Sequence, residues 1–177
     1  MSAGTTTLMP PLFEERQRFR QPWIWAVLYA EFACVVAILV IALHEQLVLH
    51  RPWGSHPVSD RALVSLVTGV LALELLVLAL LASMELRVQV DPGVLRITFT
   101  PFVRRAIPAA EIASAAACTY RPLADYGGWG IRLGRSGRAY NVSGNRGVQL
   151  ELRDGRRVLV GSQRPEELAS ALERARA

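Results

Sequence analysis

The sequence predicts a hairpin of two membrane-spanning helices followed by a mainly-β domain that ends in one helix. Three observations predict this class: two long apolar stretches before residue 85, alternation of apolar and polar residues after it, and an amphipathic C-terminal segment. About 20 apolar residues in a helix cross a hydrocarbon core, whereas alternation with a period of two is typical of half-buried strands. The chain has 177 residues, of which 51% are hydrophobic. We therefore expect a membrane anchor and one small domain.

Residues 1–21 are interpreted as a cytoplasmic, amphipathic lead-in to the first span. In the stretch "FEERQRFRQPWIW", Glu14 and Arg18 are four residues apart, the spacing of a pair on a helix surface. Pro22 fits the first turn of the spanning helix, where its missing N–H is not needed. The lead-in is either a contact for lipid headgroups or an ordinary flank of the span.

Two transmembrane helices are predicted at 22–43 and 62–84, joined by an extracytoplasmic loop over 44–61. The first apolar run is interrupted only by Glu31 and the second only by Glu74. The first run is longer than the apolar core of a cleavable signal peptide, which has about 7–15 residues. It also continues into His44, Glu45 and Gln46 without a small-residue cleavage site. We expect an uncleaved anchor.

The placement of arginine predicts the direction of the hairpin. The connecting loop carries only Arg51 and Arg61, whereas the segments that flank the hairpin carry Arg16, Arg18, Arg20, Arg87, Arg96, Arg104 and Arg105. Cytoplasmic flanks carry the excess of positive charge. The sequence therefore predicts a multi-pass protein of the cell membrane with both termini in the cytoplasm.

Glu31 and Glu74 are acidic residues inside the predicted spans. Each costs at least about 2.5–3.5 kcal/mol at the centre of a membrane helix, and with a rise of about 1.5 Å per residue their depths differ by only ~3 Å. They form either a structural hydrogen-bonding pair or part of a proton or cation path. Each lies opposite a face of small residues, so one hairpin does not bury both faces, and we expect a homo-oligomer or a membrane partner. The small faces comprise Ala26, Ala30, Ala33 and Ala37, and Ser65, Gly69, Ala72, Ala79 and Ser83.

Residues 85–177 are predicted to form a cytoplasmic domain of about eight short strands and one helix. Turns are indicated at Asp91-Pro92-Gly93 and at Asp154-Gly155. The alanine-rich stretch at 111–120 is expected to be a strand because its neighbours are strands. A helix is predicted from Pro165, with acidic residues in its first turn. This order matches a PH-like fold, in which two antiparallel sheets are closed at one corner by a helix. The expected strands are 85–91, 94–100, 103–108, 111–120, 129–134, 138–142, 148–155 and 156–162.

Four motifs together resemble a family of small prokaryotic membrane proteins with two spans and a PH-like cytoplasmic domain. They are "FEERQRFRQPWIW" (13–25), "YGGWGIR" (126–132), "AYNVSGNRGVQLEL" (139–152) and "VGSQRPEEL" (160–168). The resemblance covers most of the chain from residue 13. It implies the fold, but because the family has no assigned function it implies no catalytic residue.

The stretch "DYGGWGIRLG" (125–134) has two interpretations. A dinucleotide or Walker-type loop is excluded, because a strand instead of a helix is expected after the glycines and the chain contains no lysine. In the first interpretation Gly127, Gly128 and Gly130 are structural and allow a sharp turn into a strand, with Trp129 as an apolar anchor. In the second, an exposed surface binds a partner, and alternation turns Arg132 toward solvent, away from Ile131 and Leu133. That surface comprises Tyr126, Trp129, Arg132, Arg135, Arg138 and Arg146.

The composition favours binding over catalysis. From residue 85 onward there are 15 arginines against 9 acidic residues and no histidine. Cys34 and Cys118 are too few for a disulfide framework, and no spacing of metal ligands is visible. We expect a non-enzymatic interaction module that presents a basic domain to a protein or an anionic headgroup. The alternative is a small transport or ion-coupling subunit that uses Glu31 and Glu74. No cofactor, metal, nucleic acid or small-molecule substrate is expected.

Overall fold

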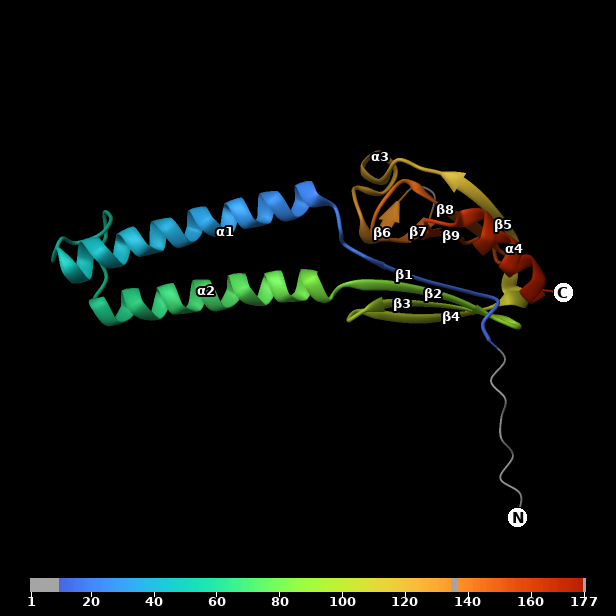
Figure 1. Ribbon diagram of the computed structural model, residues 1–177, viewed down its shortest axis with the longest axis horizontal. Coiled ribbons are helices and arrows are strands. Elements are labelled where there is room, and N and C mark those ends of the chain that lie inside the picture. Colours follow the sequence, from blue (N-terminus) through green and yellow to red (C-terminus); the bar gives the residue numbers. More distant parts are fainter. Residues whose placement is uncertain (1–9, 135–136, 177) are drawn as a thin grey trace, which may run out of the picture. The chain divides into compact units, whose positions relative to one another are not determined.

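The β-rich part of the protein is interrupted in sequence by the two long helices. The computed structural model describes residues 10–134 and 137–176. They form two compact units, one made of the segments up to Phe19 and from Met84 onward, and the other of Arg20–Ser83. The colours of Figure 1 show a strand from the start of the chain within the β-rich unit. The domain therefore begins before the hairpin as well as after it.

Two apolar helices form the helical unit. Helix α1 covers Pro22–Leu43 and is continued by a π-helical turn at His44–Val48, while α2 covers Asp60–Ser83. Both are long and apolar enough to cross a membrane, and most of their side chains are exposed. The loop predicted over 44–61 is therefore shorter, because helical structure continues to Val48 and resumes at Asp60.

The two helices pack against each other near their connection. Ala42, Leu63 and Val67 are buried there, and Leu39, Leu43 and Leu71 pack around them. The amide of Gln46 donates hydrogen bonds to the carbonyl oxygen of Val58 and to a carboxylate oxygen of Asp60, at 2.8 and 2.9 Å. These bonds tie the end of the first helical segment to the start of the second.

The predicted lead-in contains a β-strand. Strand β1 (Phe13–Arg18) pairs antiparallel with β2 (Glu85–Asp91), from Phe13 opposite Val90 to Arg18 opposite Glu85. The helix-surface pairing of Glu14 with Arg18 is thus wrong: Glu14 contacts Arg16 and Arg87, and Arg18 contacts Glu85. The pattern is hard to recognise because two of the three inward residues of β1 are polar.

The first sheet is antiparallel throughout, in the order β1-β2-β3-β4. Strand β3 covers Val94–Thr100 and β4 covers Val103–Pro108. A tight turn joins β2 to β3 at Gly93, whose φ of 80° favours glycine. The predicted alternation is confirmed, because every second residue of β2 and β3 is buried: Leu86, Val88, Val90, Leu95, Ile97 and Phe99.

The second sheet contains one parallel pair. Its order is β5-β8-β9-β7-β6, and β7 and β9 are parallel while the other neighbours are antiparallel. The expectation of two purely antiparallel sheets is therefore wrong, and the described residues form nine strands instead of about eight. The alanine-rich stretch is confirmed as a strand. The elements are β5 (Ile112–Thr119), β6 (Gly130–Gly134), β7 (Gly137–Asn141), β8 (Arg146–Leu152) and β9 (Arg157–Gly161).

Helix α4 (Pro165–Arg176) completes the core. It contacts β5 and β8 of the second sheet and β2 of the first (Figure 1). Leu168 and Leu172 are fully buried and belong to the same apolar cluster as the inward residues of both sheets. The predicted C-terminal helix is thus confirmed, and it joins two sheets around one core. A 3₁₀ turn at Ala109–Glu111 and a short helix α3 (Pro122–Tyr126) were not predicted.

Candidate anion-binding site

The glycine-rich segment ends a short helix and begins strand β6. Gly127 follows α3 in the left-handed conformation with φ of 71°, and its N–H donates to the carbonyl of Leu123. This arrangement closes the helix end, as glycine commonly does. Gly128 and Gly130 also have positive φ, and the N–H of Gly130 donates to the Asn141 side chain at 2.9 Å. These contacts agree with the structural interpretation of the three glycines.

The two aromatic residues of this segment differ in exposure. Tyr126 is buried and packs edge-to-face against Tyr120, with ring centroids 5.9 Å apart. Trp129 is half-buried, and its indole N–H donates to the carbonyl of Gly144 at 3.0 Å. Tyr126 therefore does not contribute to an exposed interaction surface, contrary to the second interpretation. Burial raises the pKa of Tyr120 to about 12, and the neighbouring Asn141 side chain partly opposes this rise.

The arginines predicted to share one surface have different surroundings. Arg132 donates to the carbonyl of Trp129, and Arg146 forms an ion pair with Glu166 of α4. Arg135 lies outside the described residues. Arg132 is exposed, as the alternation predicted, and Leu133 on the opposite face is 80% exposed as well. Both faces are open at this point because β6 is an edge strand of its sheet. Among the described members of this set, Arg138 alone lines the cavity described next.

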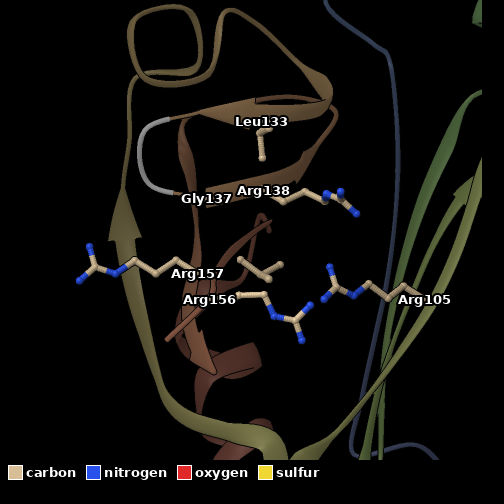
Figure 2. A pocket seen from close by; sticks show the side chains of 7 residues that line it. Arg105, Leu133, Gly137, Arg138, Arg156 and Arg157 are labelled. Carbon is tan, nitrogen blue, oxygen red and sulfur yellow. The ribbon is translucent and has the colours of Figure 1, made fainter. Parts of the chain in front are cut away.

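A cavity of about 500 Å³ lies between the two sheets of the β-rich unit (Figure 2). One wall comes from β4 of the first sheet and the other from β6, β7, β9 and the turn before β9. Of the seven lining residues that the structure describes, four are arginines. These seven are Arg105, Leu133, Gly137, Arg138, Arg156, Arg157 and Val158.

Three of the four guanidinium groups are directed toward the space between the sheets. Figure 2 shows those of Arg105, Arg138 and Arg156 turned toward this space, whereas that of Arg157 points away from it. Arg105 is held in place by a hydrogen bond from its Nη1 to the hydroxyl of the buried Tyr140, at 3.3 Å. Three cationic groups that donate hydrogen bonds therefore converge on this cavity.

No carboxylate is among the described residues that line this cavity. Arg156 uses its Nε to contact Asp154, and Arg157 lies 3.7 Å from Glu151. A backbone hydrogen bond from Arg156 lowers the pKa of Asp154, and the Arg156 side chain acts in the same direction. Arg105 and Arg138 form no ion pair with any carboxylate of the described residues. A cleft lined by one sign of charge concentrates counter-ions, so the site is suited to an anion.

Sequence reasoning found only Arg138 of the four arginines. Arg105 and Arg156–Arg157 belong to the doublets "RR" at 104–105 and 156–157, which could have drawn notice as local charge. Their meeting depends on how the first sheet packs against the second. That packing is not encoded in local spacing.

The two acidic residues of the helices do not contact one another. Glu31 is exposed on α1, whereas Glu74 is partly buried on the face of α2 that also carries Leu63, Val67 and Leu71. No hydrogen bond or ion pair of either carboxylate is present in the described part of the chain. The small face of α1 is exposed and does not pack within the hairpin. It comprises Ala26, Ala30, Ala33 and Ala37.

Comparison of the chain with known protein families, with curated proteins and with solved structures gives no match. Within residues 10–134 and 137–176, no three His, Cys, Asp or Glu side chains are grouped so that they could hold a metal ion.

Proposed function

We propose that this protein is a membrane-anchored, non-enzymatic interaction module. A PH-like β domain lies at the inner surface of the cell membrane and presents basic side chains to an anionic headgroup or an acidic protein surface. The PH-like assignment is supported by two packed sheets and a C-terminal helix that packs across them. The parallel pair β7–β9 and the strand that precedes the helices depart from that pattern.

The observation that carries this proposal is the pairing of β1 with β2. These strands lie on opposite sides of the helical hairpin in sequence, and β1 pairs with β2 along its full length. Three residues separate β1 from α1, and one residue separates α2 from β2. If both helices cross a bilayer, the chain must leave and return on the same side, because otherwise the two strands would not meet. An even number of spans satisfies this requirement.

The distribution of charge supports the cytoplasmic side for the β domain. Arginines flank both joins, including Arg16 and Arg18 on β1 and Arg87 on β2, whereas the segment between the helices carries only Arg51 and Arg61. Positive residues near the ends of spans are retained in the cytoplasm. A basic domain beside an anionic leaflet gains roughly 1 kcal/mol per arginine close to the surface.

The proposal is tested by protease treatment of right-side-out and inside-out membrane vesicles that contain the full chain. We expect the β domain to be digested only in inside-out vesicles, and we expect the protein to stay in the membrane during carbonate extraction. Digestion from the outside, or release by carbonate, would contradict the proposed topology. As a control on vesicle integrity, a tag inserted after Gly54, between α1 and α2, should show the opposite protease sensitivity.

A further inference from the structure

We propose that the cavity lined by Arg105, Arg138 and Arg156 binds the phosphoryl group of a phosphomonoester. The inference rests on the proposed function, because it assigns the anionic partner of that module to one site. This cavity differs from the surface predicted around Trp129, because Arg105 and Arg156 do not belong to that surface and lie on β4 and in the turn before β9.

The number of converging donors favours a phosphoryl group over a carboxylate. Each guanidinium carries several N–H donors in a planar fork that matches two oxygens of a phosphate. Arg105 comes from β4, Arg138 from β7 and Arg156 from the turn before β9, so the donors approach from different elements (Figure 2). A phosphomonoester offers three terminal oxygens and close to two negative charges near neutral pH. A carboxylate offers one charge and two oxygens and would leave part of this donor set without an acceptor.

The cavity also has an apolar side. Leu133 is 80% exposed and Val158 is buried, and both line the cavity. An exposed leucine beside three arginines is suited to a ligand whose phosphate is attached to a less polar group. A volume of about 500 Å³ lies in the range of about 300–1,000 Å³ that is usual for small-molecule sites.

The position of Arg105 within the first sheet bears on the source of the ligand. Arg105 pairs with Ile97, which pairs with Val88, three residues from Glu85 at the start of β2. With about 3.4 Å per residue along a strand and ~4.8 Å between strands, Arg105 lies roughly 14 Å from Glu85. Only Met84 separates Glu85 from the end of α2. The phosphomonoester therefore comes either from a membrane-lipid headgroup or from a soluble metabolite, and the experiment distinguishes these two sources.

The test measures binding to the full chain in uncharged detergent by titration calorimetry, with three probes. Dioctanoyl phosphatidic acid is a lipid phosphomonoester, glycerol 3-phosphate is its soluble counterpart, and dioctanoyl phosphatidylglycerol is a phosphodiester with the same chains. We expect phosphatidic acid to bind, and Arg105→Gln and Arg138→Gln each to weaken it about tenfold, the loss usual for one charge-assisted interaction. Arg104→Gln is the matched control, because Arg104 is the exposed neighbour of Arg105 on the same strand, and it should change binding by less than about twofold.

The outcomes decide both the site and the source. Binding of phosphatidic acid alone identifies a lipid headgroup, and equal binding of glycerol 3-phosphate identifies a soluble phosphomonoester. Equal binding of phosphatidylglycerol overturns the phosphomonoester assignment. If none of the three probes binds, or if Arg104→Gln weakens binding as much as Arg105→Gln and Arg138→Gln do, the site is overturned.

Two features of the experiment keep its result unambiguous. Arg138→Gln breaks no hydrogen bond or ion pair within the described residues, so it remains informative if Arg105→Gln, which loses the contact with Tyr140, unfolds the domain. The thermal midpoint of each variant without ligand reports that unfolding. If the cavity does not bind a phosphomonoester, the protease digestion pattern of the vesicles stays as expected. If the proposed function is wrong, that digestion pattern changes.

Discussion

The buried carboxylate of Glu15 is predicted to hold strand β1 to the rest of the β domain. Glu15 is 8% exposed and accepts hydrogen bonds from the hydroxyl of Ser162 and from the backbone N–H of Gln163, the latter at 2.8 Å. Close by, the guanidinium of Arg164 lies 4.8 Å from the ring centroid of Phe13. The "FEERQR" and "VGSQRPEEL" motifs, far apart in sequence, are therefore in direct contact.

Replacement of Glu15 by alanine should destabilise the domain by about 3 kcal/mol or more. Hydrogen bonds to a charged group contribute about 1.5–3 kcal/mol each, and two are lost. For a domain of about 100 residues, 1 kcal/mol corresponds to about 4–8 °C in the thermal midpoint. We expect a decrease of at least about 10 °C, measured by thermal unfolding of the full chain in detergent. Hydrogen exchange should show the amides of 13–18 losing protection first.

Glu14 provides the matched control, because it is the neighbouring residue on the opposite face of β1. Its ion pairs with Arg16 and Arg87 are partly exposed, and such pairs contribute about 0.2–1 kcal/mol. Glu14→Ala should lower the midpoint by only a few degrees. Equal shifts for the two variants, or unchanged exchange of 13–18 in Glu15→Ala, would refute the role assigned to the inward carboxylate.

Three further predictions concern the second sheet and its satellite core. The pKa of Tyr120 is raised to about 12 in the folded protein, so the folded state keeps a phenolic proton that the unfolded state releases near pH 10. The free energy of unfolding should therefore be unaffected below pH 10 and should fall by about 2–3 kcal/mol as the pH rises to 12. Denaturant unfolding at pH 9 and 12 should show this loss in the wild type and not in Tyr120→Phe. Gly147→Ala should destabilise the domain by at least about 2 kcal/mol, because the added methyl would lie 2.5 Å from a backbone oxygen of β9. Gly155→Ala is the control: it has open space and should cost about 1 kcal/mol through its φ of 82° alone. A smaller loss of stability for Gly147→Ala than for Gly155→Ala in urea titrations would contradict this packing. Burial raises the pKa of the Cys118 thiol, so maleimide labelling of the Cys34→Ser protein at pH 7 should be slower than that of a free thiol and should accelerate when the domain is unfolded; equal rates in the folded and unfolded protein would contradict the burial.

The sequence was informative wherever local periodicity matched the environment of a segment. The two apolar runs predicted α1 and α2 to within a few residues, since about 20 consecutive apolar residues indicate one long helix. Strands β2 and β3 were predicted with their observed bounds, because one face of each is apolar and buried. Pro165 and the acidic first turn placed the start of α4 correctly.

Local pattern was insufficient where polar residues point inward. Strand β1 carries Glu15 and Gln17 on its buried face, so the period-two pattern of apolar residues is absent. Their partners are Ser162 and Gln163 for Glu15, and the carbonyl of Gly161 for Gln17. A buried polar group is tolerated only when it is hydrogen-bonded, and such distant partners are invisible to a local reading.

The sequence by itself determined the two apolar helices, the alternating strands after residue 85 and the basic character of the β domain, because each depends on neighbours along the chain. Only the tertiary structure decided that a strand before the helices belongs to the domain after them, that β7 and β9 run parallel, and that arginines from 105, 138 and 156 face one cavity. The physical reason is that sheet pairing and sheet packing join residues far apart in sequence, and hydrogen bonds and charge at those contacts depend on the partners that folding supplies.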